Sequence, residues 1–207
     1  AMFGGKLSQS QVDGINLTIE AFDKYGDGNP RHLAYLLATK KWETAHTMQP
    51  IAEYGKGKGK PYGKKDAPGK APYGRGDVQL TWRPNYERAD KELGLGGRLA
   101  ADYDLALDPD IAVRILVTGC LKGWFTGKKL SDYTTFKDMR RVVNGTDKAD
   151  DIALLAEGFL KAIATAPKPS IPQPKPAEPS ASTNWLAALI AAIITWLKSR
   201  KGSKNVG

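Results

Sequence analysis

The sequence predicts a mainly α-helical domain with one small β-element, followed by a separate apolar helix near the C-terminus. Apolar residues recur at helical spacing through most of the chain, and a single glycine-containing extended segment interrupts them. The composition then turns Pro-rich after Ala166. We therefore expect a domain over residues 1–166, a linker over 167–183 and an apolar helix with a basic tail over 184–207. The only cysteine, Cys120, excludes an internal disulfide, so packing must hold the domain together.

Two helices are expected before the extended segment. Ser8 and Gln11 form a capping-box pattern ahead of a helix over about residues 9–24. An Asn-Pro pair then predicts the start of a second helix over about residues 30–45, with its leucines facing the core. Both helices contribute to one buried core.

Glu43 lies near the buried stripe at the end of the second helix, four residues after Thr39. Burial would disfavour its ionised form, which suits a general acid that holds its proton near neutral pH. A glutamate that points from a helix end into water is the alternative, and the helical pattern alone favours that alternative.

The run APYGRGDVQLTWRPNY combines a Gly-Arg-Gly turn, a five-residue extended piece and a proline that opens the next helix. In an extended backbone Val78 and Leu80 point one way. The side chains that point the other way are Asp77, Gln79 and Thr81. An amide and a hydroxyl thus share one face, as in sites for a polar ligand or a water. A short strand without a site is an equal alternative.

Later segments complete the helical domain. A helix starting at Pro84 should end at Gly94, and Asp108-Pro109 should open an apolar helix that buries Cys120. The expected ranges after Gly94 are about residues 109–124, 134–143 and 148–165.

The run around Gln79 resembles the YYGRGPIQLT-x-x-x-NY signature of family 19 glycoside hydrolases, which include lysozyme-like chitinases and phage endolysins. The matching positions are Tyr73, Gly74, Arg75, Gly76, Gln79, Leu80, Thr81, Asn85 and Tyr86. The resemblance covers roughly residues 8–165 and implies a lysozyme-like α-helical domain. It also implies an inverting hydrolase of β-1,4 glycosidic bonds.

The resemblance assigns the two catalytic carboxyl groups. The family has its general acid in a His-Glu-Thr or His-Glu-Ser motif, here Trp42-Glu43-Thr44, so Glu43 is the expected acid without the usual histidine. By the same resemblance Glu53 is the general base. Pro50 breaks the helix between them and lets the chain fold back, toward the roughly 6.5–9.5 Å separation that inversion needs.

Further site residues follow from the resemblance. Thr81 corresponds to the residue that holds the attacking water, and Tyr73, Gln79 and Asn85 to substrate-binding positions. Val-Asn-Gly-Thr resembles the family's Ile-Asn-Gly-Gly element, so Asn144 is expected to contact sugar. A plain helix C-cap at Asn144 is the alternative.

The formal net charge of +9 indicates an anionic partner. Six lysines between residues 55 and 70 predict a solvated, flexible loop. These lysines lack interleaved aromatic residues at a stacking spacing, which argues against a nucleic-acid protein. With two histidines and one cysteine, a zinc site is not expected, and neither is any other metal or cofactor.

Residues 184–204 predict a contact with the bacterial membrane, because an uncharged run between Trp185 and Trp196 precedes a basic cluster. A helix that packs back on the domain is the alternative. Together these features indicate a monomeric phage or prophage endolysin that cleaves peptidoglycan glycan strands. It would be made in the host cytoplasm without a cleavable signal peptide, and would act in the periplasm near the inner membrane. A chitinase, or a non-catalytic module that binds glycan or membrane, are the alternatives.

Overall fold

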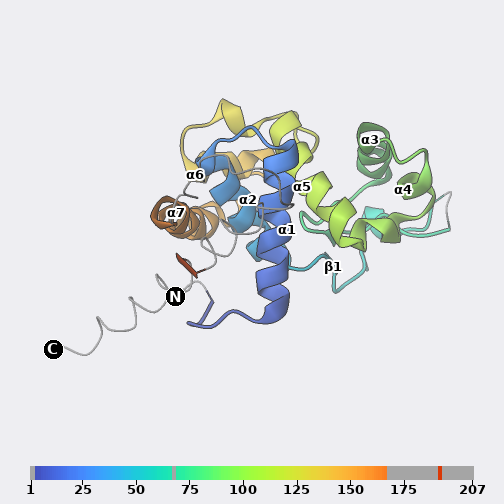
Figure 1. Cartoon of the computed structure of the whole chain (residues 1–207). Coiled ribbons are helices and arrows are strands. Elements are labelled where there is room, and N and C mark those ends of the chain that lie inside the picture. The colour runs from blue at the N-terminus through green and yellow to red at the C-terminus, as the bar shows by residue number, and fades with distance from the viewer. Residues whose placement is uncertain (1–2, 67–68, 167–190, 193–207) are drawn as a thin grey trace, which may run out of the picture.

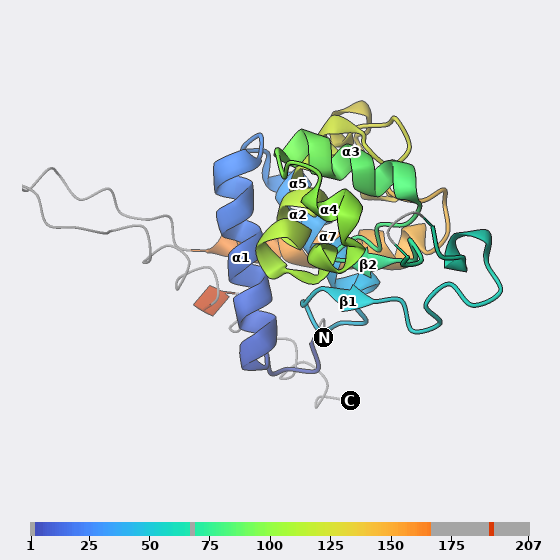
Figure 2. The ribbon, with the colours of Figure 1, turned by 90° about the vertical axis from the view of Figure 1, so that its right-hand side faces the viewer.

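The computed structural model describes residues 3–66, 69–166 and 191–192 (Figure 1). Helices dominate the domain, and β1 (Ile51–Ala52) pairs antiparallel with β2 (Arg75–Gly76) (Figure 2). This confirms the predicted mainly α fold with a small β-element. The expected linker and nearly all of the apolar C-terminal helix lie outside the described residues. Within the described ranges, no helix is long and apolar enough to cross a membrane.

Helix α2 (Pro30–Glu43) occupies the centre of the domain and packs against α7 (Ala149–Thr165) (Figure 1). Every residue from His32 to Lys41 is buried. The predicted cap is present, because the Asn29 side chain accepts a hydrogen bond from the Arg31 N–H. A helix enclosed on all sides must also bury its lysines, and each buried ammonium then needs a partner.

The other long helices surround this centre. Helix α1 (Gln9–Tyr25) starts at the predicted capping box and packs against α5 (Pro109–Lys122), which buries Cys120. Burial raises the pKa of the Cys120 thiol, as expected of a structural cysteine. Helix α3 (Arg83–Leu93) ends at Gly94 with a φ of 66°. The shorter helical segments are η1 (Pro61–Gly63), α4 (Arg98–Ala101), η2 (Tyr103–Leu107), η3 (Leu130–Asp132), α6 (Phe136–Met139) and η4 (Arg140–Val142).

The prediction of one helix over residues 134–143 is wrong in part. The chain forms the four-residue helix α6 and then tightens into the 3₁₀ turn η4. Arg140 and Val142 are both buried, whereas a straight α-helix would point them about 200° apart. Tertiary burial therefore overrides the local helical pattern.

The prediction of a five-residue extended piece after Gly76 is also wrong. The backbone turns instead, so that Leu80 exchanges two hydrogen bonds with Arg75, and Gln79 has a φ of 52°. Val78 and Asp77 are both buried, although an extended backbone would point them to opposite sides. A carboxylate oxygen of Asp77 lies 2.8 Å from Nζ of Lys40, with both side chains 0% exposed. Burial raises the pKa of Asp77, and the Lys40 ammonium opposes this change.

The connection from α2 to β1 is held against α1. Ala45, His46 and Met48 adopt positive φ values, and the Met48 N–H donates to Oγ1 of Thr44. Gly14 of α1 faces this connection so closely that a Cβ atom there would lie 1.9 Å from the Met48 carbonyl oxygen. The two backbones are therefore in direct contact, which only glycine permits.

Candidate active site

Glu43, the last residue of α2, forms an ion pair inside the domain. Its Oε1 lies 2.7 Å from Nη1 of Arg140, and the two side chains are only 15% and 3% exposed. The Nε atom of Arg140 also donates to the Asp147 carbonyl at 3.0 Å. The alternative of a glutamate pointing into water is therefore wrong. The expected burial is present, but it includes a guanidinium partner that the sequence pattern did not predict.

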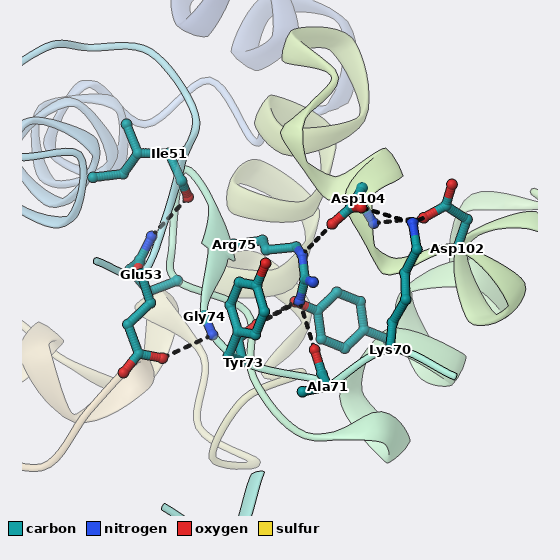
Figure 3. A network of polar contacts seen from close by, with 11 residues as sticks. Ile51, Glu53, Lys70, Ala71, Tyr73, Gly74, Arg75, Asp102 and Asp104 are labelled. Carbon is teal, nitrogen blue, oxygen red and sulfur yellow. Dashed lines mark hydrogen bonds and ion pairs between the residues drawn. The ribbon is translucent and has the colours of Figure 1, made fainter. Parts of the chain in front are cut away.

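Glu53 follows β1 and is bound at both its backbone and its side chain to Gly74. Its N–H donates to the Gly74 carbonyl at 2.7 Å, and its Oε2 accepts from the Gly74 N–H at 3.2 Å (Figure 3). Tyr62 donates its hydroxyl to Oε1 at 3.4 Å. Burial and the Glu53 charge both raise the pKa of Tyr62, so Tyr62 remains a donor. The pairing of β1 with β2 thus places this carboxylate at the Gly-Arg-Gly turn.

Arg75 holds this turn in shape from the inside. The side chain is 2% exposed, and its guanidinium carbon lies 3.6 Å from the centre of the Tyr73 ring. Its Nη1 donates to the carbonyl oxygens of Ala71 and Tyr73 (Figure 3). The Tyr86 hydroxyl also donates to the Tyr73 carbonyl, at 2.6 Å. Tyr73 thus has a structural partner, and its binding of substrate stays a prediction.

Asp104 completes the support of Arg75. Its Oδ1 accepts from Nε of Arg75 at 2.8 Å, and its Oδ2 accepts from Nζ of Lys70 at 2.7 Å. Lys70 and then Arg75 hold the pKa of Asp104 below its usual value. Lys70 also contacts Asp102 at 2.6 Å (Figure 3). The turn beside Glu53 is therefore fixed by an extended ionic network.

Three predicted site residues line one pocket of about 210 Å³: Gln79, Thr81 and Asn85. Gln79 donates through Nε2 to the Ile51 carbonyl at 3.1 Å, which joins the pocket to β1. Asn85 donates through Nδ2 to the Thr81 carbonyl at 2.8 Å. The other lining residues are Val78, Leu80, Trp82, Phe125 and Val143. The Gln79 amide and the Thr81 hydroxyl thus line the same pocket. A turn brings them together, and not the alternation of side chains along a strand.

The two glutamates do not line this pocket, yet each contacts a segment that does. Glu43 contacts Arg140, three residues before the lining residue Val143. Glu53 contacts Gly74, where a Cβ atom would lie 2.8 Å from Oε1 of Gln79. Each glutamate is therefore bound to a residue close in sequence to the pocket lining, but not to a lining residue itself.

Asn144 lies next to the pocket but is not part of its lining. The residue is exposed, and its N–H donates to the Arg140 carbonyl at 3.0 Å. This bond matches the capping alternative. Contact with sugar stays a prediction.

Two aromatic residues near Glu53 were missed in the sequence. Trp82 is 47% exposed, and its ring centre lies 5.3 Å from that of Tyr62 in an edge-on arrangement. Exposed aromatic rings can stack on the apolar faces of sugar rings. The position of Trp82 directly after Thr81 was the available signal, whereas nothing local indicated Tyr62.

Comparisons with known proteins give limited similarities. No family model matches the chain. The chain is 31% identical over 167 residues to the alpha-1,4-glucan:maltose-1-phosphate maltosyltransferase of Chlorobaculum tepidum. That match covers 80% of this chain but only 23% of the length of that protein. Among solved structures, a chitinase C mutant has a TM-score of 0.43 and 18% identity, covering 95% of this chain and 87% of that chain. These similarities do not assign the chain to a family.

Proposed function

We propose that the chain hydrolyses the β-1,4 glycosidic bonds of bacterial peptidoglycan, as a phage or prophage endolysin with a lysozyme-like fold. One observation carries the proposal. Glu53 is fixed to Gly74 in the same turn that supplies Gln79 and Thr81 to the polar pocket. An inverting glycosidase needs a carboxylate that activates its attacking water, and the family resemblance assigns Thr81 to holding that water and Gln79 to binding the substrate.

In this mechanism Glu43 donates a proton to the leaving oxygen while the bond from that oxygen to the anomeric carbon breaks. Glu53 takes a proton from the water that attacks the same carbon from the opposite face, and the Thr81 hydroxyl holds that water. Glu43 must take up a proton before this step, because it pairs with Arg140 through Oε1; we assign that proton to Oε2. Tyr73, Gln79, Asn85 and Asn144 would bind the sugar chain.

A chitinase is the second candidate, because chitin and peptidoglycan both contain N-acetylglucosamine. The net charge of +9 favours the anionic bacterial envelope over a neutral polymer. The relative from Chlorobaculum tepidum is named as a transferase acting on an α-linked glucan. That activity supports neither β-linked polymer, so the proposal rests on the site.

The location of the protein is part of the same proposal. It would be made in the host cytoplasm as a monomer and would act on the wall from the periplasm. Residues 184–204 would contact the inner membrane, because aromatic residues and lysines flank their uncharged run. This contact would hold the enzyme close to its substrate.

Mass analysis of the fragments released from purified peptidoglycan tests the function. The reducing-end sugar distinguishes cleavage after muramic acid from cleavage after glucosamine, and a parallel digestion of chitin tests the second candidate. Magnetic resonance of the fresh products should show an inverted anomeric configuration. Retained configuration would exclude the assigned mechanism. Lysis by a folded Glu43→Gln protein without any fragments would instead favour a non-catalytic binding module.

A further inference from the structure

Residues 55–65 form a lysine loop that leaves the domain after β1 (Figure 2). Its lysines are all exposed: Lys56, Lys58, Lys60, Lys64 and Lys65. Within the described part of the chain, none of the five forms an ion pair. Five unpaired ammonium groups on one short segment repel each other, so an anionic partner would stabilise them.

Hydrogen-bonded turns and a close backbone crossing shape the loop, and its flexibility stays a prediction. Successive turns are closed by hydrogen bonds from the Lys58 N–H to the Gly55 carbonyl at 2.8 Å and from the Lys60 N–H to the Gly57 carbonyl at 2.9 Å. Gly57 and Gly63 then cross so closely that a Cβ atom on Gly63 would lie 1.9 Å from the Gly57 oxygen. The loop borders an open surface hollow of about 450 Å³, lined by Gly57, Lys58, Gly59, Lys60, Pro61, Gly63 and Lys64.

Tyr62 connects this hollow to the candidate active site. It lies in the lysine loop, donates its hydroxyl to Glu53, and packs edge-on against Trp82 of the pocket. A polymer bound at Glu53 and Trp82 would therefore pass next to the lysines. Anionic groups carried by that polymer would then be close to the lysines of the loop.

We propose that the lysine loop binds the carboxylates of the peptide stems on the glycan strand that Glu53 helps to hydrolyse. This inference rests on the proposed function and specifies its substrate as an anionic glycopeptide. Lysine is a compact charge on a flexible stem, and several lysines around one hollow can follow stems whose positions vary. Chitin carries no carboxylate for them. The loop would thus distinguish peptidoglycan from the neutral polymer.

A matched pair of charge variants tests the loop. The loop variant replaces Lys56, Lys58, Lys60 and Lys64 by glutamine. The control variant replaces four exposed lysines elsewhere, so that both variants carry a net charge of +5 (9 − 4). The control positions are Lys6, Lys91, Lys128 and Lys161. The substrates are intact peptidoglycan sacculi and sacculi whose carboxyl groups have been converted to amides.

We expect the kcat/KM of the loop variant on intact sacculi at low salt to be about tenfold lower than that of wild type. The loop variant should hydrolyse intact and amidated sacculi with equal kcat/KM. Full-length wild type should prefer intact sacculi, and about 0.5 M salt should remove that preference by screening. The control variant should retain the preference. Equal losses in both variants, or equal wild-type rates on both substrates, would overturn the loop proposal while the hydrolase remains.

Co-sedimentation with the two kinds of sacculi keeps the two proposals distinguishable. Wild type that releases no fragments contradicts the proposed function. The loop proposal would still be supported if wild type bound intact sacculi more tightly than amidated sacculi and only the loop variant lost this preference. Binding that ignores amidation would reject the loop regardless of hydrolysis.

Discussion

Replacing Glu43 by glutamine should abolish most activity while keeping the fold. The amide oxygen can accept the same hydrogen bond from Arg140 that Oε1 now accepts at 2.7 Å, but the amide cannot deliver a proton. General acid catalysis contributes about 10²–10⁴-fold, and each factor of ten corresponds to about 1.36 kcal/mol of activation free energy. The expected loss in kcat is therefore at least about 10²-fold, or about 2.7 kcal/mol.

The stability of two Glu43 variants separates catalysis from folding. Glu43→Ala leaves the Arg140 guanidinium, which is 3% exposed, without its carboxylate partner, and only the Asp147 carbonyl still accepts from it. Breaking a buried ion pair in this way costs about 3–5 kcal/mol of unfolding free energy. Glu43→Gln retains an acceptor and should lose less. The assays are thermal melting by circular dichroism and the decrease in turbidity of a peptidoglycan suspension. Near wild-type turnover by folded Glu43→Gln would refute the assignment of the acid.

Three further predictions concern other parts of the chain. Thr81→Ser should retain much of the activity and Thr81→Val should lose most of it, since only the hydroxyl holds water; equal losses at unchanged melting temperature would indicate packing instead. Asp77→Asn should lower the free energy of unfolding, measured in urea, by about 3–5 kcal/mol, because it leaves the charge of the fully buried Lys40 without a counter-charge. Adding Lys40→Met should recover part of that loss, and a neutral effect of Asp77→Asn would contradict the ion pair. A chain ending at Ala166 should hydrolyse purified peptidoglycan like the full chain and no longer float with anionic liposomes. Unfolding of this shorter chain, or failure of the full chain to float, would contradict the membrane role of the tail.

Local signals predicted the helix starts well. Ser8, Asn29 and Asp108 all cap the helices that they were expected to open, because a cap depends only on residues a few positions away. Gly94 ends α3 for the same local reason. The two wrong segments, after Gly76 and around Arg140, depend on distant partners that no local pattern contains.

The residues of the candidate site also divide into those that a local motif predicts and those that only the packed fold identifies. Gln79, Thr81 and Asn85 come from one continuous motif, and the structure brings them to one pocket. Arg140 is 97 positions from Glu43 in the sequence, so only the packed fold could identify it. The support of the turn by Asp104 depends likewise on a contact 29 positions away.

The spacing of the two glutamates depends on a helix that carries neither of them. Nine residues, 44–52, connect Glu43 to Glu53, and the contact between Gly14 and Met48 fixes the course of that connection. A side chain at position 14 would clash with the Met48 backbone and displace the connection. In the proposed inverting mechanism, this displacement would change the gap between the two carboxyl groups in which the water must fit. If the proposed mechanism holds, Gly14 would thus influence the stereochemical outcome of the reaction without contacting sugar or water.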